Sequence, residues 1–172
     1  REKLSDEYNN AVIEFNEGDR NIALLKMKKV VENRDTTYSP LALYFLIDNN
    51  LLENQNEINE LFDILINKTS LEKEIKNLII YKKAMYNADK ISENDLLDIL
   101  NPILKSESVW KSHALLLMAD YFENNKNLIK SKDFLEEIVN SELINDQVKI
   151  EAERRLKRKF GASSRQAKVS HQ

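Results

Sequence analysis

Apolar residues recur at intervals of three and four positions along most of the chain. Examples are Ile22 with Leu25, and Leu61 with Ile64 and Leu65. This spacing places apolar side chains on one face of a helix, and no stretch shows the alternation typical of a strand. Short polar clusters interrupt the pattern and divide the chain into expected helices at residues 3–16, 20–33, 39–52, 57–67, 71–88, 92–105, 108–124, 127–140 and 146–160. We therefore expect an all-α fold.

Several expected helices begin with a residue that can accept a hydrogen bond from the first turn. Ser39 precedes Pro40, and proline suits the first helical position because its missing N–H has no partner there anyway. Ser70, Ser92 and Asn145 precede acidic first turns, which favour the positive end of the helix dipole. We predict that these four residues are N-caps.

Composition supports helices and excludes several classes of site. The chain has 172 residues with only two glycines and two prolines, whereas sheets with tight turns need more of both. It has no cysteine, which excludes disulfides and thiolate metal sites. Its net charge of −3 gives no reason to expect a nucleic-acid partner.

The expected helices pair into hairpins with a regular spacing. A residue in the first helix of each hairpin lies twelve positions before an equivalent residue in the second. These pairs are Ala11 with Ala23, Asp48 with Glu60, Ala84 with Leu96, and Ala119 with Ser131. Successive hairpins are offset by 37, 36 and 35 residues, although the second pair is a poor chemical match. Such a period is typical of a helical repeat protein.

The first hairpin resembles a tetratricopeptide repeat. That pattern has a small residue in the first helix, Gly-Asp at the turn, then a small and a large residue in the second helix. Ala11, Gly18-Asp19, Ala23 and Met27 match it in order. We expect Gly18 to take a left-handed backbone conformation and Asp19 to cap the second helix. The other turns are expected to use asparagine for the same conformation.

The fourth hairpin matches the same pattern, and the second and third match it poorly. The matching residues are Ala119, Lys126-Asn127, Ser131, Leu135 and Ile138. The resemblance implies a right-handed α-solenoid of about four hairpins, with a folded domain over residues 1–160. Residues 161–172 are expected to be a disordered tail or an expression remnant.

The last expected helix has an apolar stripe on a charged body. Val148, Ala152, Leu156 and Phe160 recur every four positions. A helix of this kind can cover the open face of the last repeat while its charged outer side remains exposed to solvent. We therefore predict a C-terminal capping helix.

The resemblance also implies a binding groove on the inner surface, which the first helix of each hairpin lines. The expected groove residues are Tyr8, Val12, Phe45, Asn49, Tyr81, Met85, Leu116 and Asp120. An apolar and aromatic groove could hold a peptide or a partner helix. Chaperone-binding tetratricopeptide domains hold their partner through a carboxylate clamp that needs lysine and asparagine at the positions of Tyr8 and Val12. The clamp is not present, so the chaperones that bind through it are not expected partners. Self-association is an open alternative.

No catalytic constellation, cofactor motif or metal site is recognised, so we do not expect an enzyme. His113 lies beside Trp110 and is interpreted as a packing or surface residue, because it lacks an evident acidic or nucleophilic partner. The basic run 154–159 could meet acidic lipids or RNA. We favour the reading that its cations complement the C-terminal end of the helix dipole.

A second resemblance is to bacterial inner-membrane tetratricopeptide proteins related to the ancillary subunit of the Sec translocon. It is carried by residues 97–102, Trp110, Ala114 with Ala119, and the turn at 125–127. It implies a periplasmic scaffold that binds chaperones or secreted proteins. A membrane anchor would then lie outside this chain, since no run reaches the roughly 18 apolar residues a membrane helix needs. The alternative is a cytoplasmic scaffold or regulator of the same fold.

Overall fold

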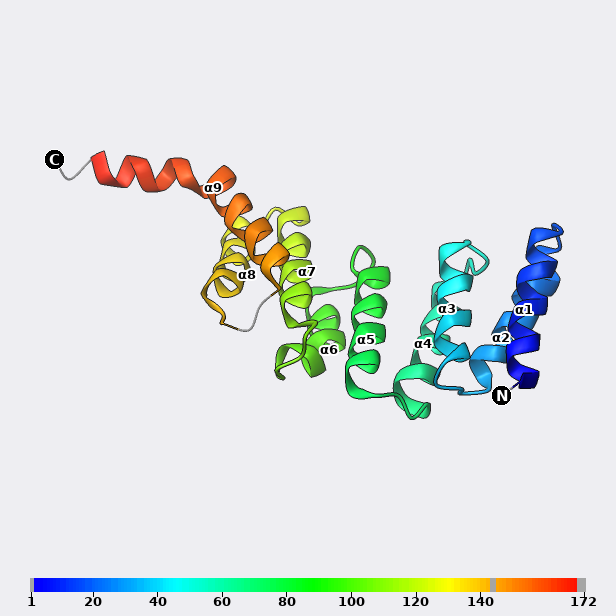
Figure 1. Cartoon of the computed structure of the whole chain (residues 1–172). Coiled ribbons are helices and arrows are strands. Elements are labelled where there is room, and N and C mark those ends of the chain that lie inside the picture. The colour runs from blue at the N-terminus through cyan, green and yellow to red at the C-terminus, as the bar shows by residue number, and fades with distance from the viewer. Residues whose placement is uncertain (1, 143–144, 170–172) are drawn as a thin grey trace. The chain divides into compact units, whose positions relative to one another are not determined.

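The computed structural model describes residues 2–142 and 145–169, with side chains as far as Gly161, and in this part helices joined by turns and loops are the regular structure, with no strand (Figure 1). The all-α prediction is confirmed for these residues. The helices are α1 (Glu2–Asn16), α2 (Arg20–Glu32), α3 (Tyr38–Asp48), α4 (Gln55–Lys68), α5 (Lys73–Asn87), α6 (Glu93–Leu104), α7 (Lys111–Asn124), α8 (Leu128–Asn140) and α9 (Asp146–Val169). Internal contacts divide the chain into two compact units, residues 1–83 and 84–172. A single repeat domain over 1–160 stays a prediction.

Two of the four predicted N-caps are confirmed. The side chain of Ser92 accepts a hydrogen bond from the N–H of Asp95 at 3.2 Å. That of Asn145 accepts from the N–H groups of Gln147 and Val148 at 3.0 and 3.3 Å. Each cap pairs first-turn N–H groups that have no partner inside the helix.

The predicted cap at Ser39 is wrong. Helix α3 begins one residue earlier, and the Asp35 carboxylate accepts from the N–H groups of Thr37 and Tyr38 at 2.9 and 2.7 Å. Buried Ser39 instead donates its hydroxyl to the carbonyl of Val30 at 2.7 Å, which ties the start of α3 to the end of α2. A carboxylate two or three residues ahead of the helix thus displaces the hydroxyl from the capping role.

The cap predicted at Ser70 is also wrong. Helix α5 begins at Lys73, and the carboxylate of Glu72 accepts from the N–H groups of Glu74 and Ile75 at 3.1 and 3.3 Å. The Glu72 side chain thus reaches first-turn N–H groups of α5 from the position directly before the helix.

In the first unit, each helix contacts the next along the chain from α1 to α4, and α1 also contacts α3 while α2 contacts α4. Ala11 of α1 and Ala23 of α2 are fully buried, so the two helices approach closely at small side chains. Met27 and Val30 of α2 are also fully buried. Burial of each such large side chain stabilises the fold by about 2 kcal/mol.

The turn at Gly18 has the predicted left-handed conformation, with φ of +93°. The N–H of Gly18 donates to the carbonyl of Phe15 at 3.0 Å and that of Asp19 to Glu14 at 2.9 Å, a Schellman motif that ends α1. The Asp19 carboxylate then accepts from the N–H of Ile22 at 3.2 Å and caps α2. Both predicted roles are confirmed.

Two other hairpin turns repeat this geometry. Asn50 has φ of 53° after α3, as predicted for asparagine. In the turn after α7 the left-handed residue is Lys126, with φ of 60°, and not an asparagine. Asn127 takes the place of Asp19, because its side chain accepts from the N–H of Lys130 at 3.2 Å. The asparagine prediction is therefore right at the second turn and wrong at the third and fourth, since no residue between α5 and α6 has a positive φ.

In the second unit, α7, α8 and α9 contact one another pairwise. The core cluster between them is formed by Leu115, Ala119, Leu135, Ile138, Val148 and Ala152. Leu156 and Phe160 pack against this cluster, so the apolar stripe predicted on the last helix faces α7 and α8. Ser131 of α8 is buried and donates its hydroxyl to the carbonyl of Ala119 at 2.9 Å.

Helix α9 continues past the predicted end at residue 160 as far as Val169. Gly161 therefore does not end the helix. The prediction that residues 161–172 form a disordered tail or an expression remnant stays a prediction. Residues 170–172 lie outside the described part.

We expect Gly18→Ala to lower the free energy of unfolding by about 1–2 kcal/mol, because a side chain there is strained in the left-handed conformation. Lys126→Gly should raise the free energy of unfolding by roughly 0.5–1 kcal/mol, because glycine adopts the left-handed conformation of residue 126 without strain. Urea unfolding of the two variants measures both changes. Gly161→Ala is the matched control, since Gly161 is helical and a Cβ there meets open space, so this substitution should gain up to about 1 kcal/mol. A neutral Gly18→Ala would contradict the role given to this turn.

Candidate functional site

The eight predicted groove residues fall into both units. Tyr8, Val12, Phe45, Asn49 and Tyr81 belong to residues 1–83, and Met85, Leu116 and Asp120 belong to residues 84–172. A single groove through all eight therefore stays a prediction. Within each unit, the structure places these side chains in specific contacts.

Four aromatic rings form a continuous series on α1 and α3, which we call the aromatic ladder (Tyr38, Tyr8, Phe45 and Phe15). The ring centroids of Tyr38 and Tyr8 are 6.0 Å apart, and those of Tyr8 and Phe45 are 6.5 Å apart. Phe45 and Phe15 meet edge to face at 5.2 Å. All four rings are half-buried, so the ladder holds the two helices together and also reaches the surface.

Sequence reasoning found Tyr8 and Phe45 and missed the other two rings. Phe15 was detectable from its spacing of seven residues after Tyr8, which returns to the same helix face. Tyr38 was missed because residues 33–40 looked like a loop, whereas Asp35 caps the helix early enough to include it.

One end of the ladder carries a cation from the chain itself. The guanidinium of Arg20 lies 5.5 Å from the centroid of the Phe15 ring and donates to the carbonyl of Asn49 at 3.1 Å. The Asn49 amide donates to the carbonyl of Phe45 at 2.9 Å. Asn49, expected as a groove residue, thus makes two hydrogen bonds at the C-terminal end of α3. Its side-chain amide donates to Phe45, and its carbonyl accepts from Arg20.

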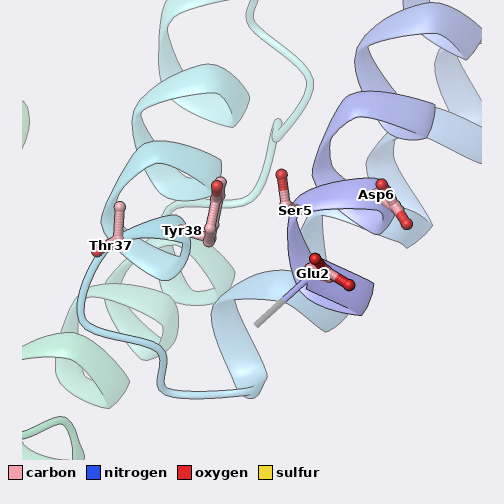
Figure 2. A pocket seen from close by; sticks show the side chains of 5 residues that line it. All are labelled: Glu2, Ser5, Asp6, Thr37 and Tyr38. Carbon is pink, nitrogen blue, oxygen red and sulfur yellow. The ribbon is translucent and has the colours of Figure 1, made fainter.

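The other end of the ladder opens onto a cavity of about 550 Å³, which we call the acidic pocket. It is lined by Glu2, Ser5, Asp6, Thr37 and Tyr38. Figure 2 shows Glu2, Ser5 and Asp6 on α1, and Thr37 and Tyr38 at the start of α3. Sequence reasoning missed this pocket, although the spacing of four residues between Glu2 and Asp6 places both carboxylates on one helix face.

Burial raises the pKa of Tyr8 above its ordinary value of 10.0. The phenol therefore stays neutral at physiological pH and keeps its donor hydrogen. Val12 is half-buried on α1, and Tyr81 is half-buried on α5. Helix α5 is tied to α3 by the Lys82 ammonium, which lies 4.6 Å from the centroid of the Tyr44 ring.

In the second unit, α9 engages two of the predicted groove residues. Leu116 packs against the core cluster that includes Val148 and Ala152 of α9. The Asp120 carboxylate pairs with the Arg155 guanidinium of α9. These side chains therefore serve the attachment of α9 to α7.

Met85 and Asp120 both line a second cavity, of about 570 Å³. The other lining residues are Tyr86, Ala88, Asp89, Lys90, Ile91, Leu117, Tyr121, Asn124 and Asn125. Several of these groups have internal partners. The Tyr121 hydroxyl donates to the carbonyl of Ile91 at 3.1 Å, and the Lys90 ammonium lies 4.4 Å from the centroid of the Tyr86 ring.

The basic run 154–159 is largely paired with acids. Arg155 contacts Glu151 at 2.8 Å as well as Asp120, and the Lys159 ammonium contacts Glu123 of α7. Arg154 contacts Glu151 at 2.6 Å. Arg155 and Lys159 thus hold α9 to α7, whereas Arg154 pairs within α9. The helix-dipole explanation is wrong, because α9 continues beyond the run to Val169.

His113 packs against Trp110, with ring centroids 5.2 Å apart, as the packing interpretation expected. Burial lowers the pKa of His113 below its ordinary value of 6.5. Among the side chains that are described, no group of three His, Cys, Asp or Glu is placed to hold a metal ion. None of the described helices combines the length and apolarity needed to cross a bilayer.

We expect Arg155→Met to weaken the attachment of α9, because it leaves the partly buried Asp120 without its partner. The free energy that protects the amides of residues 146–160 from hydrogen exchange should fall by about 1 kcal/mol. Arg154→Met is the matched control, since Arg154 is 67% exposed and its ion pair among the described side chains is with Glu151 of the same helix. It should cost less than about 0.5 kcal/mol. Equal losses in the two variants would contradict the role of the Asp120 pair.

We expect acid to destabilise the fold through His113. Its folded pKa is lowered, so the unfolded chain binds the proton more readily. The free energy of unfolding should be at its full value above pH 6.5 and should fall as the pH drops from there through the folded pKa. Urea unfolding across this range measures the effect. His113→Gln should remove this part of the pH dependence, whereas His171→Gln should retain it. An unchanged slope in His113→Gln would assign the effect to other groups.

Comparisons with family models, with curated proteins and with solved structures found no match. Both family resemblances therefore rest on the residues of this chain, and they enter below as proposals.

Proposed function

We propose that this chain is a non-catalytic protein-binding module that holds a polypeptide segment on the face of α1 and α3 that carries the aromatic ladder. The observation that carries the proposal is the aromatic ladder, which is only half-buried although it joins the two helices. Aromatic rings at a surface offer large contact area, and they are enriched where proteins bind one another.

Neighbouring residues extend this apolar surface. Leu41 lies between Tyr38 and Phe45 at helical spacing, and 41% of it is exposed. Ring edges and an exposed aliphatic side chain together suit an apolar or aromatic side chain of a partner.

For the architecture, we propose that the hairpins stack as tetratricopeptide-like repeats within each unit. Three observations support this arrangement. In the first unit, α1 contacts α3 and α2 contacts α4, as expected when one hairpin stacks on the next. The turns at Gly18-Asp19 and Lys126-Asn127 have the same Schellman and capping hydrogen bonds. The small residues that match the repeat pattern, Ala11 with Ala23 and Ala119 with Ser131, are buried.

For the partner and the location, we propose a secreted protein or chaperone at the periplasmic face of the bacterial inner membrane. The resemblance of residues 97–127 to the ancillary Sec translocon subunit family supports this form of the proposal. A cytoplasmic scaffold that uses the same surface is the alternative.

Site-specific photo-crosslinking in cells tests the binding surface. A photoreactive phenylalanine in place of Leu41 should capture a defined polypeptide at least about fivefold more strongly than the same residue in place of Leu25. Leu25 is the matched control because 60% of it is exposed and it lies on α2, outside the ladder. The captured partner also locates the chain, since exported partners support the periplasmic form and cytosolic ones support the alternative.

Equal capture from the two positions would contradict the ladder as the binding surface. A readout of folding accompanies the test, because both substitutions should leave the helical circular dichroism of the chain unchanged.

A further inference from the structure

We propose that the outer face of α9 docks on a membrane surface that contains anionic phospholipids. Three cations make the contact, Arg154, Lys157 and Arg158, which we call the cationic stripe, together with the exposed side chain of Ile150. This inference goes beyond the proposed function and does not depend on it, because the aromatic ladder lies on α1 and α3.

The first argument is the division of the α9 cations between two faces. Arg155 and Lys159 pair with carboxylates of α7 and so serve the packing of the helix. The three residues of the cationic stripe are exposed instead. At 3.6 residues per turn, their positions are centred opposite the apolar stripe that packs against α7 and α8. The attachment of α9 therefore turns the cationic stripe toward solvent.

The second argument is that the chain leaves this charge largely uncompensated. Residues 154–172 contain seven lysine and arginine residues and no aspartate or glutamate, whereas the whole chain has a net charge of −3. Residues 1–153 therefore carry a net charge of −10. A positive end on an otherwise negative chain favours an anionic partner at that end.

The local ion pairs agree with this charge distribution. Arg154 pairs with Glu151 of the same helix at 2.6 Å, and Glu151 also holds Arg155 at 2.8 Å. Among the described side chains, Lys157 and Arg158 have no ion-pair partner. The stripe thus keeps at least two charges that no carboxylate of the chain neutralises.

The third argument is the length of the basic face. Positions 165 and 168 also hold basic residues, eleven positions after Arg154 and Lys157, and eleven residues make about three complete helical turns. The helix rises about 21 Å from residue 154 to residue 168. Figure 1 shows the last turns of α9 extending past α7 and α8. A flat anionic surface can therefore approach this face along its whole length.

Ile150 favours a membrane over a nucleic acid as the anionic surface. It is 63% exposed and precedes Arg154 by four positions, which places it on the same face of α9. A bilayer interface accommodates an apolar side chain among cations, whereas a contact made through phosphates offers it no partner. The cationic stripe also lacks the aromatic side chains on which bases stack. The face therefore fits a lipid surface better.

The docking is electrostatic, with little insertion into the bilayer. The apolar stripe of α9 is already buried against α7 and α8, so it does not enter the lipid as the apolar face of an interfacial helix does. Each cation near an anionic bilayer strengthens binding about fivefold. The guanidinium groups of Arg154 and Arg158 can each donate two hydrogen bonds to a lipid phosphate. Binding is thus reversible and sensitive to salt.

Co-sedimentation of the full chain with lipid vesicles tests the inference. Vesicles that contain about 30% phosphatidylglycerol in phosphatidylcholine should bind the chain at least about tenfold more strongly than vesicles of phosphatidylcholine alone. This preference should shrink as the ionic strength rises. Equal binding to the two kinds of vesicle, or binding to neither, would overturn the inference.

The triple variant Arg154→Gln/Lys157→Gln/Arg158→Gln should lower binding to the anionic vesicles at least about tenfold. Its helical circular dichroism should be unchanged, because all three side chains are exposed.

Lys29→Gln/Lys68→Gln/Lys105→Gln is the matched control, since it removes the same charge from exposed positions outside α9. It should keep most of the vesicle binding. Equal losses in the two triple variants would assign the binding to net charge and overturn the role of the cationic stripe.

Ile150→Gln distinguishes a membrane from a nucleic acid. It should weaken binding to the anionic vesicles about threefold or more, because an apolar side chain no longer leaves water. An RNA oligonucleotide of about twenty residues should not be retained with the chain in filter binding at the same salt concentration. Vesicle binding that Ile150→Gln leaves unchanged, or RNA binding that the stripe variant abolishes, would overturn the choice of a membrane.

Discussion

Close contact between helices at small side chains is the constraint on which both units depend. Ala11 and Ala23 are buried on the paired helices α1 and α2, and Ala119 and Ser131 are buried on the paired helices α7 and α8. Ser131 adds a hydrogen bond to the carbonyl of Ala119 that only a small polar residue can make at such close range. Because α1 packs on α2 and both helices contact α3, α1 and α3 are held side by side in the first unit. The aromatic ladder forms across that contact between α1 and α3.

Local sequence signals predicted the helices and the first turn well, because their causes are local. The left-handed turn at Gly18 follows from a single residue, and Ser92 and Asn145 cap the helices they directly precede. The errors at Ser39 and Ser70 have a common cause. In each case the helix begins at a different residue from the one predicted, and a carboxylate, of Asp35 or Glu72, accepts from N–H groups at the observed start. Sequence alone does not decide which of two neighbouring capping residues sets the start of a helix.

The candidate site was only partly predictable. Tyr8 and Phe45 followed from the repeat register, but the acidic pocket depends on where α3 begins, and that was misjudged. Asp120 and Leu116 also followed from the register, yet α9 uses both. Which helix covers a given face is decided by tertiary pairing, in this case by Arg155 and Lys159 meeting acids on α7. The periodic pattern has no information about such partners.

The position of α9 has a consequence for how a chain of this kind could change in length during evolution. Helix α9 contacts both α7 and α8, just as α3 contacts both α1 and α2, so it stands where another hairpin would begin. Its outer residues, among them Glu153, Arg154, Lys157 and Arg158, are charged and exposed. A hairpin packed against that side would meet mainly charged side chains, with Ile150 as an exposed apolar exception. A hairpin gained by duplication would therefore find apolar partners more readily upstream of α9 than against the charged outer side of this helix.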